Sequence, residues 1–156
     1  MRTREQTIRR LALQIFEITK RNWIASQREK MKSGFDLSES EFLTLDALED
    51  VESLSVGELR QHVGVLPAQM SRIIKALEQR YDEKLVLCAI NRKDKRKIDV
   101  SITPKGRRVV AGYRRAKIMS SIEGLGRMDD RDLAHLSAIM EKVEAAQAQK
   151  GAARSP

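Results

Sequence analysis

Cysteine, proline, glycine and aromatic residues are scarce in this chain of 156 residues. It has one cysteine, three prolines and eight glycines, and 4% of its residues are aromatic. A lone cysteine, Cys88, excludes a disulfide framework and a cysteine-based metal site within one chain, so a reducing, cytoplasmic location is expected. Few residues interrupt helices, and apolar residues recur about every 3.6 positions, which together predict a mostly helical fold.

Long apolar segments are also absent. The longest stretch without a charged residue, 61–71, has eleven residues, fewer than the roughly 18 that a membrane span requires. The basic segment 1–10 is not followed by the apolar block of a secretory signal. We therefore expect a soluble protein with no membrane partner.

Motifs for catalysis are missing. We find no glycine-rich phosphate loop, serine elbow or paired-carboxylate motif in the sequence. The two histidines, His62 and His135, are too scattered to form a recognisable metal site or catalytic base. The sequence thus predicts no enzyme, no catalytic residue, no metal and no cofactor.

Positive charge, in contrast, is abundant and concentrated. The chain has 30 lysines and arginines against 22 acidic residues, a formal charge of +8. Residues 56–108 contain 13 cations and 6 anions, a net charge of +7, whereas 1–55 sum to −1 and 109–156 to +2. Such a basic segment favours a nucleic acid as the partner.

Helix start signals recur in the middle of the chain. Ser38 with Glu41, and Ser55 with Glu58, have the spacing of a capping box, in which each residue's side chain bonds the other's backbone N–H. Pro67 suits the first position of a third helix, because it lacks the N–H that would be unpaired there. This succession predicts a helix-turn-helix arrangement.

Longer helices are predicted on both sides of this segment. One spans residues 5–32, a second spans 104–124, and a third starts at Asp129. The apolar stripe of the first helix needs a partner along its length. On the last helix we expect four buried side chains, those of Leu133, Leu136, Met140 and Val143.

The helix beginning at Pro67 has two different faces. Four apolar residues share one side: Met70, Ile73, Ile74 and Leu77. The opposite side is small, polar and basic, which suits a major groove about 12 Å wide. We assign Arg72 to guanine, Gln69 to adenine, Ser71 to a base or phosphate, and Lys75 to a phosphate. The alternative for Arg72 is an exposed arginine without a partner.

A β-hairpin is predicted from the apolar run 85–90 and the alternating residues 98–102. Five cations lie among the seven residues of its tip, 91–97. Four of them are assigned to DNA, on phosphates or in the minor groove: Arg92, Lys93, Lys95 and Arg96. Asp94 is expected to hold the Arg96 guanidinium by a charge-assisted hydrogen bond, although an ordinary turn residue is an equal alternative.

Cys88 and Trp23 are the remaining reactive or aromatic candidates. In the apolar run, Cys88 is predicted to be a small buried hydrophobe, and redox sensing would instead need an exposed thiol of low pKa. Trp23 is expected in the core or an interface, with an effector pocket as the alternative.

Taken in order, these motifs resemble the winged-helix regulators of the MarR family. The matching segments are Leu37-Ser38 with Phe42, residues 55–59, residues 63–65, Ser71-Arg72, Leu77-Glu78, residues 94–96 and residues 102–106. Two features depart from the family pattern. Leu66 stands where a serine or threonine cap is usual, and 79–85 has no glycine and is a few residues longer.

The resemblance implies a mainly α fold with a small β-hairpin wing. It implies an N-terminal dimerisation helix (1–36), a winged helix-turn-helix module (37–108), C-terminal dimerisation helices (109–150) and a flexible tail (151–156). It further implies a homodimer that binds an inverted repeat in double-stranded DNA as a repressor. A small aromatic effector is implied as its ligand, with oxidation controlling some members of the family.

The leading hypothesis is a sequence-specific duplex DNA-binding transcriptional regulator. A nucleic-acid binder without sequence preference would use the same charge, but single-strand binders stack bases on aromatic side chains, and 56–108 contains only Tyr81. A winged helix kept as a protein-interaction module is the other alternative, and it predicts no affinity for duplex DNA at low salt.

Overall fold

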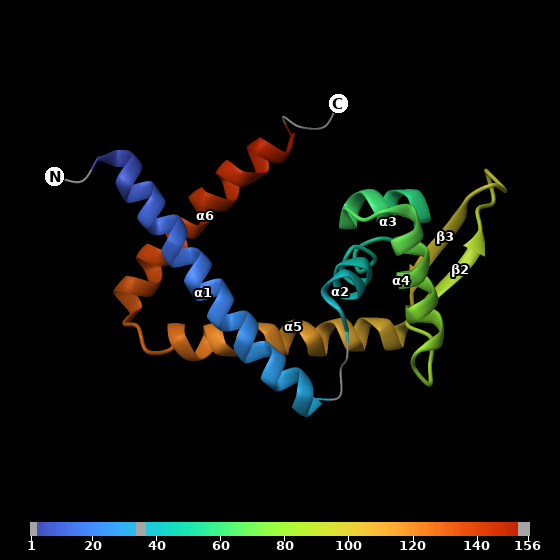
Figure 1. Cartoon of the computed structure of the whole chain (residues 1–156), viewed down its shortest axis with the longest axis horizontal. Coiled ribbons are helices and arrows are strands. Elements are labelled where there is room, and N and C mark those ends of the chain that lie inside the picture. Colours follow the sequence, from blue (N-terminus) through green and yellow to red (C-terminus); the bar gives the residue numbers. More distant parts are fainter. Residues whose placement is uncertain (1–2, 34–36, 153–156) are drawn as a thin grey trace. The chain divides into compact units, whose positions relative to one another are not determined.

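The computed structural model describes the backbone of residues 3–33 and 37–152 and the side chains of residues 3–28 and 37–149. These parts form six helices and three strands (Figure 1). The helices are α1 (Arg4–Ser33), α2 (Glu39–Asp46), α3 (Val56–Val63), α4 (Pro67–Gln79), α5 (Pro104–Leu125) and α6 (Asp130–Ala152). The strands are β1 (Leu54–Ser55), β2 (Val86–Ile90) and β3 (Ile98–Ile102). The predicted fold class, mainly helical with a small sheet, is confirmed.

Two compact units make up the chain, Met1–Lys117 and Ile118–Pro156, and α5 crosses their boundary. Parts of two predicted regions lie outside the described residues: positions 1–2 and 34–36 of the N-terminal helix region, and positions 153–156 of the tail. The first two residues of the predicted tail, Gly151 and Ala152, belong to α6.

Both predicted capping boxes are present. The Ser38 hydroxyl accepts from the Glu41 N–H at 3.2 Å, and the Glu41 carboxylate accepts from the Ser38 N–H at 2.7 Å. Ser55 and Glu58 repeat these bonds at 3.3 and 2.8 Å. The two boxes pair backbone N–H groups that a helix start otherwise leaves unsatisfied, so they fix where α2 and α3 begin. At the other end of α3, Gly64 adopts a left-handed conformation with φ of 71°, which favours glycine.

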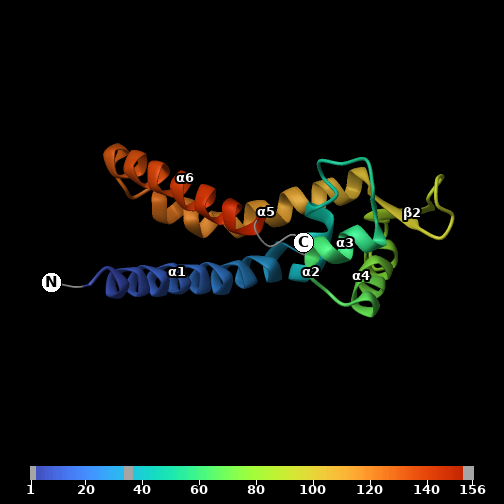
Figure 2. The same cartoon turned by 90° about the horizontal axis from the view of Figure 1, so that it is seen from above.

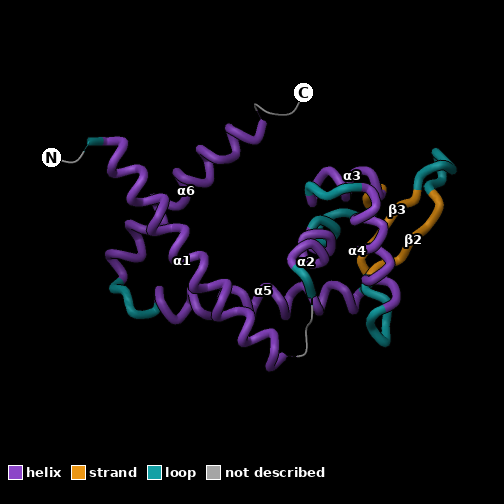
Figure 3. The backbone as a smooth tube through the Cα atoms, viewed as in Figure 1, coloured by secondary structure: helices purple, strands orange, loops and turns teal. Residues whose placement is uncertain are grey.

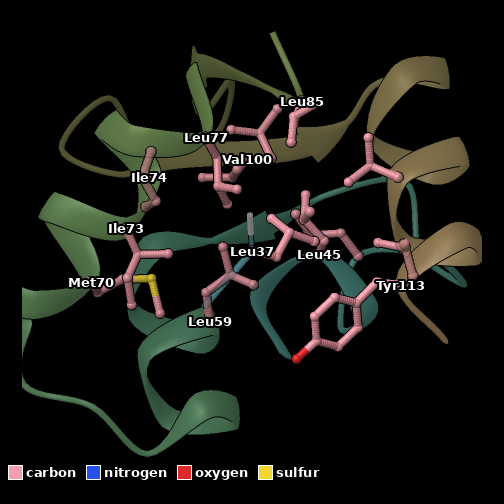
Figure 4. Close-up of a cluster of buried hydrophobic side chains, with 14 residues drawn as sticks. Leu37, Leu45, Leu59, Met70, Ile73, Ile74, Leu77, Leu85, Val100 and Tyr113 are labelled. Carbon is pink, nitrogen blue, oxygen red and sulfur yellow. The ribbon is translucent and has the colours of Figure 1, made fainter. Parts of the chain in front are cut away.

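The core lies among α2, α3, α4, the sheet and the first half of α5 (Figure 4). As predicted, α4 buries Met70, Ile73, Ile74 and Leu77. From α5, Tyr113 is also buried, and its ring stacks on Phe42 with the centroids 4.5 Å apart. This core fixes α4 by its apolar side and leaves the polar side in solvent.

Apolar side chains of α1 and α6 remain largely exposed in the single chain. On α1, eight of them are each 45% to 61% exposed: Ile8, Leu11, Leu13, Ile15, Phe16, Ile18, Trp23 and Ile24. On α6, Leu133 and Leu136 are half-buried, whereas Met140 and Val143 are 48% and 38% exposed. The prediction of four buried side chains on α6 is thus wrong for the single chain, because the spacing of an apolar stripe does not reveal whether the same chain covers it.

The sheet has the order β1-β3-β2, with both pairs antiparallel. Along the hairpin, Val86 pairs with Ile102 and Ile90 with Ile98, and a loop joins the two strands (Figure 3). The sequence did not predict β1, because two residues directly before a helix cap carry no periodic pattern. Its pairing of Leu54 with Val100 attaches the start of α3 to the wing.

The base of the wing closes against the start of α5. The Thr103 hydroxyl donates to the Lys84 carbonyl at 2.7 Å and accepts from the Gly106 N–H at 3.0 Å. A Cβ added to Gly106 would lie 2.3 Å from the Leu85 carbonyl oxygen. Only glycine therefore allows α5 to approach the chain this closely at the root of the wing.

Replacing Gly106 with alanine is expected to lower the free energy of unfolding by roughly 1 to 3 kcal/mol, because backbone atoms must move to accept the methyl group. Gly124 on the same helix is the control, since an added Cβ there meets nothing within 4 Å. Gly124→Ala should be neutral or stabilising by up to about 1 kcal/mol. Chemical denaturation of the three proteins tests this, and equal stability of Gly106→Ala and the parent would contradict it.

Candidate nucleic-acid interface

The exposed side of α4 carries the four residues predicted to contact DNA. Gln69, Ser71, Arg72 and Lys75 are all exposed, opposite the side that the core buries. Leu66 stands at the N-cap, where a serine or threonine is usual in the family, and its apolar side chain makes no capping hydrogen bond. The helix therefore presents a small, polar and basic surface whose direction is set by core packing.

The hydrogen-bonding capacity of these side chains differs. Among the described residues, Arg72 and Lys75 have no carboxylate within 4.0 Å, so their charges are not neutralised by an ion pair. The Ser71 hydroxyl instead donates to the Pro67 carbonyl of its own helix at 3.2 Å. To donate to a phosphate, this hydroxyl must first rotate away from the carbonyl.

Hydrogen bonds to asparagine and aspartate side chains hold the wing tip in shape. The Asn91 carbonyl oxygen accepts from the backbone N–H groups of Lys93 and Asp94, both at 2.8 Å. The Asn91 amide also donates to the Asp99 carboxylate at 2.8 Å. Our sequence reasoning missed Asn91 and Asp99, although asparagine at the start of a turn is a usable signal.

Asp94 makes the predicted hydrogen bond to Arg96. Its Oδ1 accepts from both the side-chain Nε and the backbone N–H of Arg96, each at 3.1 Å. These side-chain and backbone bonds lower the pKa of Asp94 below its usual value. The Arg96 side chain is nonetheless 91% exposed, so the bond orients a guanidinium that stays available to a ligand.

The Asp94 bond should persist to lower pH than an ordinary aspartate would allow. Because the folded pKa is lowered, the interaction is present above the usual pKa and is lost as the pH falls through the folded value. We expect the NMR resonance of Arg96 Nε–H to titrate with a midpoint below the usual aspartate range. Asp94→Asn should abolish that titration, and a midpoint at or above the usual range would contradict the assignment.

A groove separates α4 from the wing. It has a volume of about 490 Å³. Figure 2 shows the hairpin that contains β2 extending beyond α3 and α4. Ser71 and Lys75 line it from α4, and Arg96 lines it from the wing. These three predicted residues thus share one surface, whereas Gln69, Arg72, Arg92, Lys93 and Lys95 lie outside this groove.

Cys88 lies in the same groove and corrects a prediction. It was expected to be buried, but it is exposed, because only Val86 of β2 lies against the core and the strand then continues outward. Partial burial of the thiol and the neighbouring Glu78 carboxylate raise the Cys88 pKa to about 11. A thiol of this pKa is protonated near neutral pH and lacks the low pKa that oxidant sensing requires.

Other kinds of site have little support in the structure. Over residues 3–33 and 37–152, no group of three or more histidine, cysteine or acidic residues is arranged to hold a metal ion. None of the described helices combines the length and apolar character needed to span a membrane.

Comparison with known proteins supports the winged-helix fold. Residues 37–80 match the model of the MarR family. No curated protein matches the sequence. The family match and the fold confirm the resemblance found in the sequence.

Solved structures extend the likeness to nearly the whole chain. The YusO protein of Bacillus subtilis is 20% identical, with a TM-score of 0.73 over 93% of this chain and 99% of that chain. A MarR family protein of Bacillus stearothermophilus is 14% identical, with a TM-score of 0.78 over 94% and 99%. BpsR of Bordetella bronchiseptica, whose DNA binding is regulated by 6-hydroxynicotinic acid, is 20% identical, with a TM-score of 0.58 over 84% and 91%. At these identities the likeness establishes the fold.

Proposed function

The segment 37–80 belongs to the MarR family, and the chain has the fold of its winged-helix regulators. On that premise we propose that this protein is a homodimeric, sequence-specific DNA-binding regulator of transcription. It acts as a repressor, in the cytoplasm, by occupying an inverted repeat in double-stranded DNA. It works by binding and is not an enzyme.

The observation that carries this proposal is the pairing of two exposed cationic elements on one module. The outer side of α4 and the wing tip flank the same groove, within the segment of net charge +7. A helix with a small polar side enters the major groove, and a cationic hairpin follows the phosphate backbone toward the minor groove.

The residue roles follow from the geometry of each side chain. Arg72 donates to guanine O6 and N7, and Gln69 pairs with adenine. Lys75 and the wing cations Arg92, Lys93 and Lys95 contact phosphates, which set register without reading sequence. Arg96, oriented by Asp94, enters the narrow minor groove.

A second copy of the chain is the partner proposed for α1 and α6. Both helices leave large apolar side chains in solvent, and burying such side chains against a partner favours association. A twofold dimer presents two α4 helices and therefore matches an inverted repeat with half-sites about one helical turn apart. Sedimentation of the purified protein measures this state directly.

We extend the proposal to control by a small aromatic effector. Support comes from BpsR, which shares the fold and whose DNA binding is regulated by 6-hydroxynicotinic acid. Consider a dimer with two forms, of which only one fits DNA. A ligand with higher affinity for the other form shifts the population toward it and so releases the operator.

Selection of duplexes from a randomised pool, at near-physiological salt, tests the proposal. Enrichment of an inverted repeat supports a sequence-specific dimer. Salt-sensitive binding without enrichment would leave only the electrostatic attraction and favour a binder without sequence preference. No duplex binding at low salt would instead favour a protein-interaction module.

A further inference from the structure

Glu41 is the one buried charged residue among the described side chains. It is 3% exposed and lies at the start of α2. Its carboxylate already accepts from the Ser38 N–H in the capping box. A capping box does not require a buried carboxylate, since Glu58 serves the same purpose on α3 while exposed.

The second partner of Glu41 is Arg80, 39 residues further along the chain. Glu41 Oε1 lies 2.8 Å from Arg80 Nη2, and Glu41 Oε2 accepts from Arg80 Nη1 at 3.1 Å. This is a two-pronged contact, in which both carboxylate oxygens meet the planar guanidinium. Such a pair constrains direction as well as distance.

Arg80 is the C-cap of α4, and its N–H donates to the Ala76 carbonyl at 2.9 Å. The pair therefore joins the end of α4 to the beginning of α2. Apolar burial is non-directional, whereas a two-pronged contact fixes the relative direction of the two groups it joins, so the pair adds a constraint at the end of α4 that core packing does not supply. Arg72 lies eight residues before this anchor, about 12 Å along the helix axis.

We infer that the Glu41–Arg80 pair is a positioning pair that orients α4 for base recognition and so determines sequence discrimination. The inference rests on the proposed function. Neither residue needs to touch DNA: Glu41 is buried, and both terminal nitrogens of Arg80 already contact Glu41. A tilt of α4 misplaces Arg72 and Gln69 against base edges, while contacts with phosphates tolerate the change.

The substitution Glu41→Gln weakens the contact with Arg80 and leaves the capping box possible. Glutamine keeps one oxygen, which can accept from the Ser38 N–H as Glu41 Oε2 does, but it removes the negative charge and places an NH₂ group where Glu41 Oε1 meets Arg80 Nη2. Glu83→Gln is the matched control, because Glu83 is exposed, lies 3.9 Å from Lys105, and changes the net charge equally.

The experiment measures affinity for the selected duplex and for an unrelated duplex of equal length, with folding checked by circular dichroism at the assay temperature. We expect Glu41→Gln and Arg80→Ala to reduce the ratio of the two affinities by about tenfold or more. Affinity of Glu41→Gln for the unrelated duplex should change no more than in Glu83→Gln, which should keep the ratio of the parent. Arg80→Ala lowers the net charge by one, so it is judged by the ratio and not by this control.

Arg80→Lys keeps the charge but not the fork, so it tests the inference even if the other variants fail to fold. A reduced ratio supports positioning by the two-pronged contact. A ratio equal to that of the parent overturns it. If Arg80→Ala weakens both duplexes alike and lowers the salt dependence, Arg80 is a phosphate contact and the inference is also overturned. A parent protein without discrimination would instead refute the proposed function itself.

Discussion

Replacing Arg72 with alanine is expected to weaken binding to the selected duplex by roughly 1 to 3 kcal/mol for each half-site. The Arg72 side chain lies on the exposed side of α4 without an ion-pair partner among the described residues. Its removal therefore breaks no described ion pair and deletes the proposed two-pronged bond to guanine. Discrimination should be lost at one base position, which a titration of single-base variants of the duplex will identify.

Lys75→Ala on the same side of α4 is the control for this result. A lost phosphate contact weakens all sequences alike and leaves discrimination at every base position unchanged. If Arg72→Ala binds the selected duplex as tightly as the parent does, the assignment of α4 as the recognition helix is wrong.

Replacing Arg92, Lys93 and Lys95 together with alanine should have the largest effect on the salt dependence of binding. Each phosphate contact contributes about 0.9 to the slope of log K against log salt, so six cations in a dimer contribute about five. The parent should therefore lose roughly a thousandfold more affinity than the variant between about 50 and 200 mM salt. Affinity measurements at several salt concentrations give both slopes.

Three cations outside the winged module provide the matched control. Arg127, Arg131 and Lys142 are exposed, and replacing them with alanine changes the net charge by the same amount. This second variant should keep the slope of the parent. Equal slopes for both variants would show that total charge, and not the wing, governs the affinity.

Local chemistry explains why much of the fold was predictable. Ser38 and Glu41 satisfy each other three residues apart, and Met70 and Ile74 meet on one side of a helix because of its period. The tip contact between Asp94 and Arg96 is equally local. Each of these features depends on residues within one or two helical turns, so the sequence alone contains the necessary information.

The features that sequence reasoning missed depend on residues brought together by folding. Arg80 meets Glu41 across 39 positions, and Asn91 meets Asp99 across the hairpin. Cys88 lies in an apolar run, which is typical of a buried strand. Its exposure depends on how much of the strand the helices cover, and the sequence of the strand does not contain this information. Gly106 was part of a recognised motif, yet its need to be glycine comes from the Leu85 carbonyl.

The charge of the seven residues of the wing tip also affects the stability of the wing when no DNA is bound. Five cations among them are kept together by the backbone bonds from Asn91 N–H to Lys97 O and from Lys97 N–H to Asp94 O, both 2.9 Å. Mutual repulsion of these like charges opposes the closed loop, and dissolved ions screen it over about 10 Å at 0.1 M salt. Raising the ionic strength thus has two opposite effects on the wing. It weakens the repulsion among the wing cations and so favours the closed loop, and it also weakens the attraction of these cations to a polyanion.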